Sequence, residues 1–292
     1  MVTDMKNGAF EHDNMDIPKG DRVLPMFSLK DRTAIVSGAG AGIGLGVAQA
    51  FAEAGANVAI WYNSNKQAVT EAENIQKMYS VKCKAYQVNV ISADAVDKAI
   101  GEIIREFNGR LDIFVANSGI AWEDGPFLDG HVETAKKVMA VNVDGVMWCA
   151  KSAGIHFRRQ KKEGKTIDGK PLENYICGSF IATASMSGKI VNVPKLQAVY
   201  NGSKAAVIHF CKSLAVEWTG FARVNTVSPG YIKTEVSSFA EAGTEEQRKN
   251  KIPMGREGQV SELKGSYLYL ASDAASYITG LDMIVDGGYS LL

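Results

Sequence analysis

Short apolar runs rich in β-branched residues alternate with longer segments whose apolar residues recur at helical spacing. The runs predict seven strands, over residues 33–38, 57–62, 84–90, 111–118, 179–185, 223–229 and 282–288. Stretches such as VAQAFAEAGA, AVDKAIGEIIREF and AAVIHFCKSLAVEW lie between them and are predicted helices. Near-continuous apolar strands that alternate with helices indicate a parallel sheet covered on both faces. We therefore predict a single α/β domain with a doubly wound, seven-stranded parallel sheet.

Two segments lie outside this alternation. Residues 1–27 are mostly polar, so we expect a flexible N-terminal arm before a domain that covers residues 28–292. Residues 158–178 are basic and contain Gly and Pro between a predicted helix and the fifth strand. We expect a surface insertion far from the chemistry, because this segment enters the amino end of its strand, whereas ligands of such sheets bind beyond the carboxyl ends.

Composition and charge exclude several classes of function. The 292 residues are 46% hydrophobic and include 32 basic and 32 acidic side chains, so no net charge attracts nucleic acid or an anionic membrane. No apolar run is long enough to span a bilayer, and the N-terminus lacks the apolar core of a signal peptide. The four cysteines and four histidines have no metal-ligand spacing. We therefore expect a cytoplasmic protein with reduced cysteines and no metal.

A glycine-rich turn, SGAGAGIGLG (37–46), follows the first predicted strand and opens a predicted helix. Glycine lets the backbone approach a pyrophosphate, and the helix N-terminus supplies N–H donors and the positive end of its dipole. Two glycine sets fit the spacing G-x-x-x-G-x-G, namely Gly38, Gly42 and Gly44 or Gly40, Gly44 and Gly46. We prefer the first set, because its first glycine stands where the predicted strand ends. A Rossmann-type dinucleotide site is therefore predicted here, with Ile43 beside the glycines.

The end of the second strand predicts which dinucleotide binds. A carboxylate there would accept hydrogen bonds from the ribose hydroxyls and repel a 2′-phosphate. The sequence NVAIWYNSNKQ (57–67) has no acid at this place. Asn63 and Ser64 can donate to a phosphate and Lys66 can balance its charge. These residues favour NADP(H) as the cofactor.

The segment QAVYNGSKAA (197–206) places a phenol and an ammonium four residues apart. On a helix such residues share one face, so Tyr200 and Lys204 can meet at one site. Reduction of a ketone by hydride places negative charge on oxygen, which calls for a proton donor and hydrogen-bond donors. A nearby lysine cation is expected to lower the pKa of Tyr200 and make it a better acid. Ser185, at the end of a strand, can donate to the carbonyl oxygen, and Ser187 is the competing candidate.

Six motifs, in order and spacing, resemble those of the short-chain dehydrogenase/reductase family. They are SGAGAGIG, ANSG (116–119), VNVDG (141–145), ATASMSG (182–188), YNGSK (200–204) and VSPGYIKTE (227–235). The resemblance covers residues 28–292. FSLKDR, AIWYNSN, LQAVYNGSKAA, EWTGFARVNTVSPGYI and the DGGY tail look like the fungal and yeast NADPH-dependent ketose and carbonyl reductases, a group that includes sorbose reductases and NADP-dependent mannitol dehydrogenases.

The resemblance implies further roles. It favours Ser185 over Ser187 as the catalytic serine, gives Lys204 a hold on the nicotinamide ribose, and lets Asn142 hold a water that links the lysine to solvent. Family positions that contact the cofactor are matched by Asn89, Val90, Asn117, Gly119, Pro229, Gly230, Ile232 and Thr234. The motif ANSG carries Ala116 where asparagine is usual, and Asn89 stands where many relatives have Asp beside the adenine. A homotetramer is also implied, with helices around residues 132–158 and 198–218 and the C-terminal GGYSLL at the contacts.

The substrate is a small carbonyl compound or polyol. Trp122, Ser187, Asn192 and Gln197 are predicted to face it, and their polar groups suit a sugar. The preferred function is reversible, NADPH-dependent reduction of a ketose such as sorbose, fructose or a xylulose-like sugar to its polyol, with Tyr200 as general acid and base. The alternative enzyme is a broad carbonyl reductase for non-sugar ketones or a reductase of a secondary-metabolite pathway. A dinucleotide sensor without catalysis is the third hypothesis.

Overall fold

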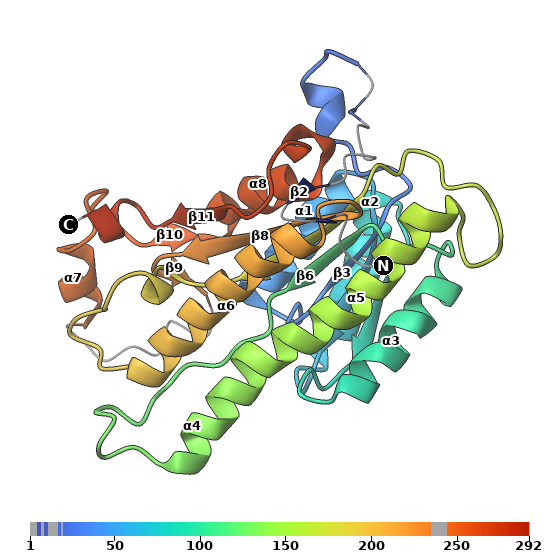
Figure 1. The fold of residues 1–292 in the computed structure, drawn as a ribbon. Coiled ribbons are helices and arrows are strands. Elements are labelled where there is room, and N and C mark those ends of the chain that lie inside the picture. Colours follow the sequence, from blue (N-terminus) through green and yellow to red (C-terminus); the bar gives the residue numbers. More distant parts are fainter. Residues whose placement is uncertain (1–4, 7–8, 11–16, 19, 235–243, 292) are drawn as a thin grey trace.

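The computed structural model describes residues 5–6, 9–10, 17–18, 20–234 and 244–291, and a single sheet forms its centre (Figure 1). Seven parallel strands pair in the order β11-β8-β7-β6-β3-β4-β5. The strands are β3 (Thr33–Val36), β4 (Asn57–Tyr62), β5 (Cys83–Gln87), β6 (Ile113–Ala116), β7 (Gly178–Thr183), β8 (Ala222–Pro229) and β11 (Asp282–Val285). The predicted seven-stranded parallel sheet is confirmed, each strand within a few residues of its predicted ends.

Helices cover both faces of the sheet, as predicted. They are α1 (Gly42–Glu53), α2 (Gln67–Tyr79), α3 (Ala93–Glu106), α4 (Val132–Met139), α5 (Gly145–Glu163), α6 (Ala198–Glu217), α7 (Thr244–Lys249) and α8 (Val260–Ala271). One apolar core joins α1, α2 and α8 to the sheet through residues such as Phe51 and Leu263. A second core, on the other face, includes Phe157 of α5 and Leu214 of α6. Within the described part of the chain, no helix is both long and apolar enough to cross a membrane.

The direction of winding reverses between β3 and β6, at the middle of the sheet. From β3 the chain winds through β4 to β5 at one edge, and from β6 it winds through β7 and β8 to β11 at the other. Such a reversal opens a crevice beyond the carboxyl ends of the two central strands. The Ser37 hydroxyl closes its floor by accepting hydrogen bonds from the backbone N–H groups of Asn117, at 3.0 Å, and Ser118, at 3.1 Å.

Only short pieces of the predicted N-terminal arm lie among the described residues. Strands β1 (Met5–Lys6) and β2 (Ala9–Phe10) pair with each other in antiparallel orientation, and the 3-10 helix η1 (Leu24–Phe27) follows. The ring of Phe27 lies 6.3 Å from that of Tyr269 on α8. The last residues of the arm therefore pack on the domain, and much of the arm whose flexibility was predicted lies outside the described residues.

The insertion predicted at 158–178 is shorter in the structure than in the prediction. Helix α5 continues to Glu163, because it ends in a left-handed glycine, Gly164, whose φ is 62°. The irregular part is therefore residues 164–177, at the end of the sheet opposite the carboxyl ends of the strands (Figure 1). Its backbone contacts the start of β6: Ile167 N–H donates to Gly109 O at 2.9 Å.

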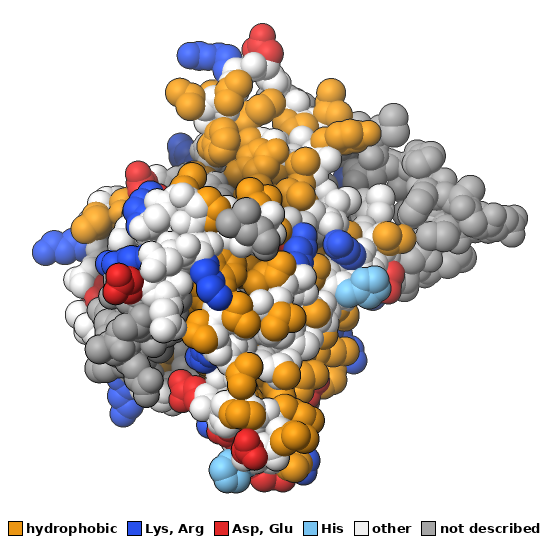
Figure 2. Space-filling model, turned by 90° about the vertical axis from the view of Figure 1, so that its left-hand side faces the viewer, with side chains coloured by type: hydrophobic (Ala, Val, Ile, Leu, Met, Phe, Trp, Pro, Cys, Tyr) orange, Lys and Arg blue, Asp and Glu red, His pale blue; other side chains and the backbone are white. Residues whose placement is uncertain are grey.

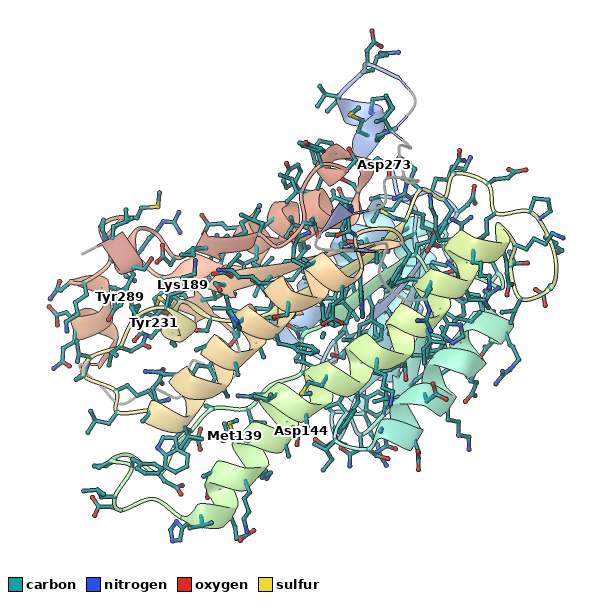
Figure 3. All side chains as sticks on the ribbon, in the orientation of Figure 1. Met139, Asp144, Lys189, Tyr231, Asp273 and Tyr289 are labelled. Carbon is teal, nitrogen blue, oxygen red and sulfur yellow. The ribbon has the colours of Figure 1, made fainter. Side chains whose placement is uncertain are left out.

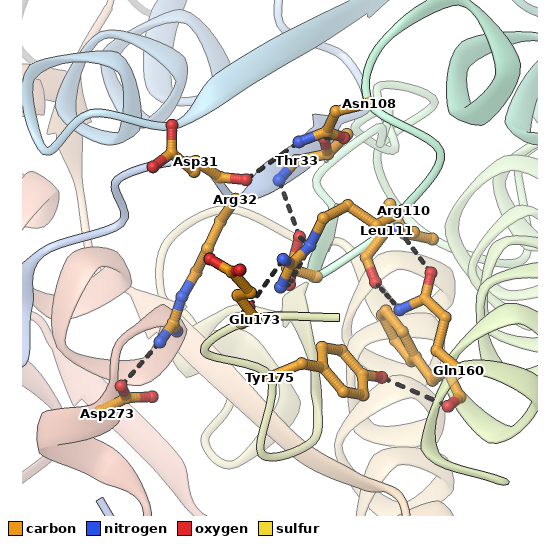
Figure 4. Close-up of polar contacts among 12 residues, drawn as sticks. Asp31, Arg32, Thr33, Asn108, Arg110, Leu111, Gln160, Glu173, Tyr175 and Asp273 are labelled. Carbon is orange, nitrogen blue, oxygen red and sulfur yellow. Dashed lines mark hydrogen bonds and ion pairs between the residues drawn. The ribbon is translucent and has the colours of Figure 1, made fainter. Parts of the chain in front are cut away.

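Buried polar contacts fix this insertion to the sheet (Figure 4). The Arg110 guanidinium donates to both carboxylate oxygens of Asp112 and, at 2.8 Å, to the backbone carbonyl of Glu173 in the insertion. Asp112 also accepts from Thr33 N–H at 2.8 Å. The side chain of Gln160 on α5 accepts a hydrogen bond from Leu111 N–H at 2.7 Å and donates one to Leu111 O at 2.6 Å. Most of residues 164–177 are exposed, so the segment lies at the surface, and these hydrogen bonds hold it to the sheet.

Candidate active site

A cavity of about 510 Å³ lies at the carboxyl ends of the central strands. Its walls come from the turns after β3, β4, β6 and β7, from the first turns of α6, and from the end of β8. The lining residues are Gly38, Gly40, Ala41, Gly42, Ile43, Tyr62, Asn63, Ser64, Asn65, Asn117, Gly119, Ile120, Ala121, Thr183, Ala184, Ser185, Tyr200, Lys204, Pro229, Gly230 and Thr234. Most of the predicted cofactor and catalytic residues, far apart in sequence, therefore meet in one place.

The glycine turn has the geometry of a phosphate cradle. Gly38 and Gly42 have φ angles of 62° and 56°, which side chains with a Cβ rarely adopt. A Cβ on Gly44 would lie 2.4 Å from the carbonyl oxygen of Gly38, so this glycine lets helix and strand approach. These positions match the preferred register. In the alternative register, Gly46 faces α8 instead, where a Cβ would lie 2.3 Å from Val260 Cγ1.

The N-terminus of α1 is open to an anion. No side chain among the described residues caps it, and its N-cap residue, Ala41, lines the cavity. The first N–H groups of a helix lack intrahelical partners and attract negative charge. This end of α1 and the glycine turn fit the diphosphate of a dinucleotide.

The end of β4 bounds the cavity with amides and hydroxyls. Asn63, Ser64 and Asn65 line it, and none of the lining residues listed above is acidic. Asn65, which the sequence analysis did not single out, donates to Gly40 O at 3.1 Å and accepts from Gln67 N–H at 3.1 Å. It joins the glycine turn to the start of α2. A 2′-phosphate fits here because donors face it and no lining carboxylate repels it.

Helix α6 presents Tyr200 and Lys204 to the cavity, and β7 ends beside them. The Lys204 ammonium donates to Thr183 O at 2.9 Å and lies 5.7 Å from the centre of the Tyr200 ring. Ser185 hydrogen-bonds the Tyr200 side chain. The i,i+4 spacing therefore brings the phenol and the ammonium together as expected, with the serine next to the phenol.

The pKa of Tyr200 differs from the sequence-based expectation. Burial raises it above the ordinary tyrosine value, and the hydrogen bond with Ser185 offsets this only in part. Burial also lowers the pKa of Lys204 to about 8. The expected lowering of the tyrosine pKa by lysine is thus wrong for the protein alone, because removal from water disfavours both charged forms. Tyr200 is a neutral phenol there.

Asn142 lies behind the lysine instead of lining the cavity. It is fully buried in a π-helical segment, η2 (Ala140–Asp144), between α4 and α5. Its side chain accepts from Ile120 N–H at 2.8 Å and donates to Ile120 O at 3.0 Å and to Ser203 Oγ at 3.1 Å. Ser203 in turn donates to Tyr200 O at 2.7 Å. Asn142 ties the loop after β6 to α6, and its predicted water-holding role stays a prediction.

Several residues that were predicted to contact the substrate or the cofactor do not line this cavity. Trp122 is 1% exposed, and its indole N–H donates to Gly125 O at 2.8 Å. The ring is enclosed by the loop 123–130 and does not line the cavity, so its contact with substrate stays a prediction. Asn89 is exposed and accepts from Ile91 N–H, and Val90 packs against Gly145. Ile232 pairs with Gly258 in the short strands β9 (Ile232–Lys233) and β10 (Gly258–Gln259).

Ser187, Asn192 and Gln197 form a buried group behind Ser185. The Gln197 amide donates to Ser187 Oγ at 3.2 Å and to Asn192 Oδ1 at 3.1 Å. Since these side chains hydrogen-bond one another and do not line the cavity, they support its wall. Residues that line the cavity but were missed, such as Thr183, Ile120 and Ala121, lie at strand ends. Their position after a strand was the available signal.

With the fold, this cavity defines a class of protein, the NADP(H)-dependent oxidoreductases. Comparison with known proteins narrows the class. A family model described as enoyl-(acyl carrier protein) reductase matches residues 38–290, and the chain belongs to the short-chain dehydrogenase/reductase family that it represents.

Three relatives illustrate the similarity. The chain is 80% identical over 287 residues to L-xylulose reductase of Hypocrea jecorina (strain QM6a), covering 98% of this chain and 100% of the relative. It is 48% identical over 270 residues to a sorbose reductase of Candida albicans (strain SC5314), covering 92% and 90%. The crystal structure of NADPH-dependent 3-quinuclidinone reductase from Rhodotorula rubra superposes with a TM-score of 0.87 at 39% identity, covering 97% and 100%. These findings confirm the family and the cofactor.

Proposed function

We propose that this enzyme reduces a ketose to its polyol with NADPH, and that a ketopentose such as L-xylulose is the preferred substrate. The observation that carries the proposal is a single cavity in which a phosphate cradle and the group Ser185, Tyr200 and Lys204 face one another. The similarity to an L-xylulose reductase and a sorbose reductase supports a ketose as the carbonyl substrate.

In the proposed mechanism the residues of the chain handle the proton and the developing charge. NADPH, when bound, supplies the hydride that adds to the carbonyl carbon. The Tyr200 hydroxyl donates its proton to the carbonyl oxygen, while Ser185 donates a hydrogen bond to the same oxygen. Lys204, held at Thr183 O, keeps its proton below pH 8 and stabilises the tyrosinate that the proton transfer leaves. In the reverse direction the tyrosinate takes the proton from the alcohol.

The cofactor contacts follow from the walls of the cavity. The glycine turn and the end of α1 would hold the diphosphate, and Asn63 and Ser64 the 2′-phosphate. Gly119, Pro229, Gly230 and Thr234 border the same space and suit contact with the nicotinamide half. Asn89, Val90 and Ile232 stay predictions as cofactor contacts.

The test is a substrate panel in which NADPH oxidation is followed by absorbance with L-xylulose, L-sorbose, D-fructose and an aryl ketone, and the product alcohol is identified. We expect the highest kcat/KM with L-xylulose. Absence of turnover with every ketose, with reduction of the aryl ketone, would overturn the assignment in favour of a carbonyl reductase.

A carbonyl reductase for non-sugar ketones is the second candidate. Three apolar residues, Ile120, Ala121 and Ala184, line the cavity near Ser185, and they can accept an apolar ketone. The similarity to a 3-quinuclidinone reductase points in the same direction. The substrate panel distinguishes the two candidates directly.

A homotetramer in the cytoplasm is proposed for the assembly and location. Exposed apolar side chains support helix contacts: Val132 and Met139 on α4, Ile155 on α5 and Val216 on α6. Figure 2 shows further apolar side chains on the end of the molecule that carries the C-terminus, where Met254 and Leu291 are exposed. All four cysteines are free, which suits a reducing compartment. Light scattering of the purified protein tests the tetramer.

A further inference from the structure

A buried polar group stands directly behind the serine of the proposed site. Ser185 Oγ accepts a hydrogen bond from Ser187 N–H at 3.2 Å and donates one to Ser187 Oγ at 3.1 Å. Ser187 Oγ accepts a second hydrogen bond, from Gln197 Nε2 at 3.2 Å. All three residues are less than one-tenth exposed. The oxygen of Ser185 is thus anchored by the backbone, and its hydrogen points at Ser187 when no substrate is bound.

The neighbours of Gln197 fix the orientation of its amide. Asn192 donates through its Nδ2 to the Tyr231 hydroxyl at 3.4 Å, and its Oδ1 accepts from Gln197 Nε2 at 3.1 Å. Asn201 Oδ1 lies 3.0 Å from the same nitrogen. This end of the Gln197 amide is thus the NH₂ group in the structure, and its two hydrogens are shared among three oxygen acceptors.

Two tyrosines from other segments pack behind this group. Tyr231 packs edge to face on Tyr289 with ring centres 5.4 Å apart, and Figure 3 shows the two side chains next to each other. Tyr289 also donates to Val193 O at 3.3 Å, in the loop that carries Asn192. The C-terminal turn therefore holds this loop, and with it the amide of Gln197, in place.

We propose that Gln197 is a positioning residue that keeps the Ser185 hydrogen available for the substrate. Ser187 Oγ accepts from two donors at once, and two donors on one hydroxyl oxygen weaken each other. The Ser185 hydroxyl can then leave Ser187 for the carbonyl oxygen at small cost. At the same time, the Ser187 N–H on its oxygen makes the Ser185 hydroxyl a stronger donor. This inference rests on the proposed function of the cavity as a carbonyl-reducing site.

The decisive substitution is Gln197→Glu, which keeps the size and turns the donor into an acceptor. Ser187 would donate to the carboxylate and become a better acceptor, so Ser185 would be held on it. We expect kcat to fall about tenfold, the scale of one hydrogen bond to a charged group, while KM for NADPH and for the ketose changes less than about threefold. Gln197→Met, which removes the donor without adding an acceptor, should cost about threefold.

A second substitution separates this role from simple packing. Ser187→Ala removes the acceptor but leaves the backbone N–H that anchors Ser185. In the Ser187→Ala background, Gln197→Glu should therefore cause no further loss of kcat. Asn201→Asp is the matched control, because it places a carboxylate on the Gln197 amide group without contact to Ser187. We expect its kcat to stay within about threefold of the unmodified enzyme.

The results distinguish failure of the proposed role of Gln197 from failure of the proposed ketose substrate. Unchanged kcat in Gln197→Glu, or an equal loss with and without Ser187, would overturn the role of Gln197. If Gln197→Glu does not fold, as judged by its thermal transition, Gln197→Met with and without Ser187→Ala decides in the same way. If the unmodified enzyme reduces no ketose, the proposed substrate is wrong. The Gln197 test is then made with the ketone that it does reduce.

Discussion

The two ends of the central sheet carry polar clusters of opposite kind. At the amino ends, Arg110, Asp112 and Gln160 are buried and hydrogen-bond the sheet, the insertion or each other. At the carboxyl ends, the glycine turn, Ser185 and Tyr200 line a cavity. Polar groups therefore hold structure together at one end and leave hydrogen-bond capacity for a ligand at the other. Polar residues mark a candidate site when their groups face an open space.

The largest effect is expected from Tyr200→Phe, which removes one oxygen at the cavity end. Loss of the proton donor should lower kcat by about 10²–10⁴. NADPH affinity, measured by fluorescence titration, should stay within about threefold, because the ring and Lys204 remain. Stopped-flow NADPH oxidation measures the rate. Residual activity within tenfold would show that another group supplies the proton.

At the opposite end, removal of one ion-pair partner should affect stability and not activity. Arg110→Met leaves the buried Asp112 carboxylate without its cation, and we expect the free energy of unfolding to fall by about 3–5 kcal/mol. The double variant Arg110→Met/Asp112→Asn should regain much of this, because the amide is uncharged and still accepts from Thr33 N–H. Denaturant unfolding measures the stability. A kcat per folded molecule that falls with stability would contradict the separation of the two ends.

Features of the two ends that have local causes could be predicted from the sequence, whereas those that depend on distant segments could not. Strands, helices and the meeting of Tyr200 with Lys204 follow from spacing, since apolar runs and i,i+4 pairs have local causes. The end of α5 was misplaced because the basic residues of its last turns resemble a loop. The burial of Trp122 was not predicted because it depends on how the loop 123–130 folds over it. The raised pKa of Tyr200 and the hydrogen bonds of Gln197 depend on packing between distant segments, which no local pattern contains.

Lys204 provides a pH test at the cavity end. Its pKa falls from 10.5 to about 8 on burial, so between these values the unfolded chain binds a proton that the folded chain lacks. The stability of the unmodified enzyme relative to Lys204→Met should therefore rise as pH increases from 8 to 10.5, by about 2–3 kcal/mol in total. Below pH 8 the folded protein carries the buried ammonium, and its desolvation lowers the free energy of unfolding by the full amount. Paired denaturant titrations from pH 7 to 10.5 measure the difference, and a constant difference would contradict the assigned burial.

The smallest expected effect concerns the choice of cofactor at the end of β4. Asn63→Asp places a carboxylate where no lining residue named for the cavity is acidic, so it should repel a 2′-phosphate and accept from ribose hydroxyls. Because Asn63 is exposed, water screens the charge, and we expect the ratio of kcat/KM for NADPH to that for NADH to fall only about tenfold.

Asn89→Asp is the control for this change. It adds the same charge near the end of β5, but the adenine that Asn89 is predicted to contact is common to both dinucleotides, so the NADPH-to-NADH ratio should not move. Steady-state kinetics with both cofactors and one ketose give the two ratios. An unchanged ratio in Asn63→Asp would place the 2′-phosphate elsewhere, whereas equal shifts in both variants would indicate a long-range effect of charge. A shift confined to Asn63 would locate cofactor selection in a side chain at the open end of the sheet.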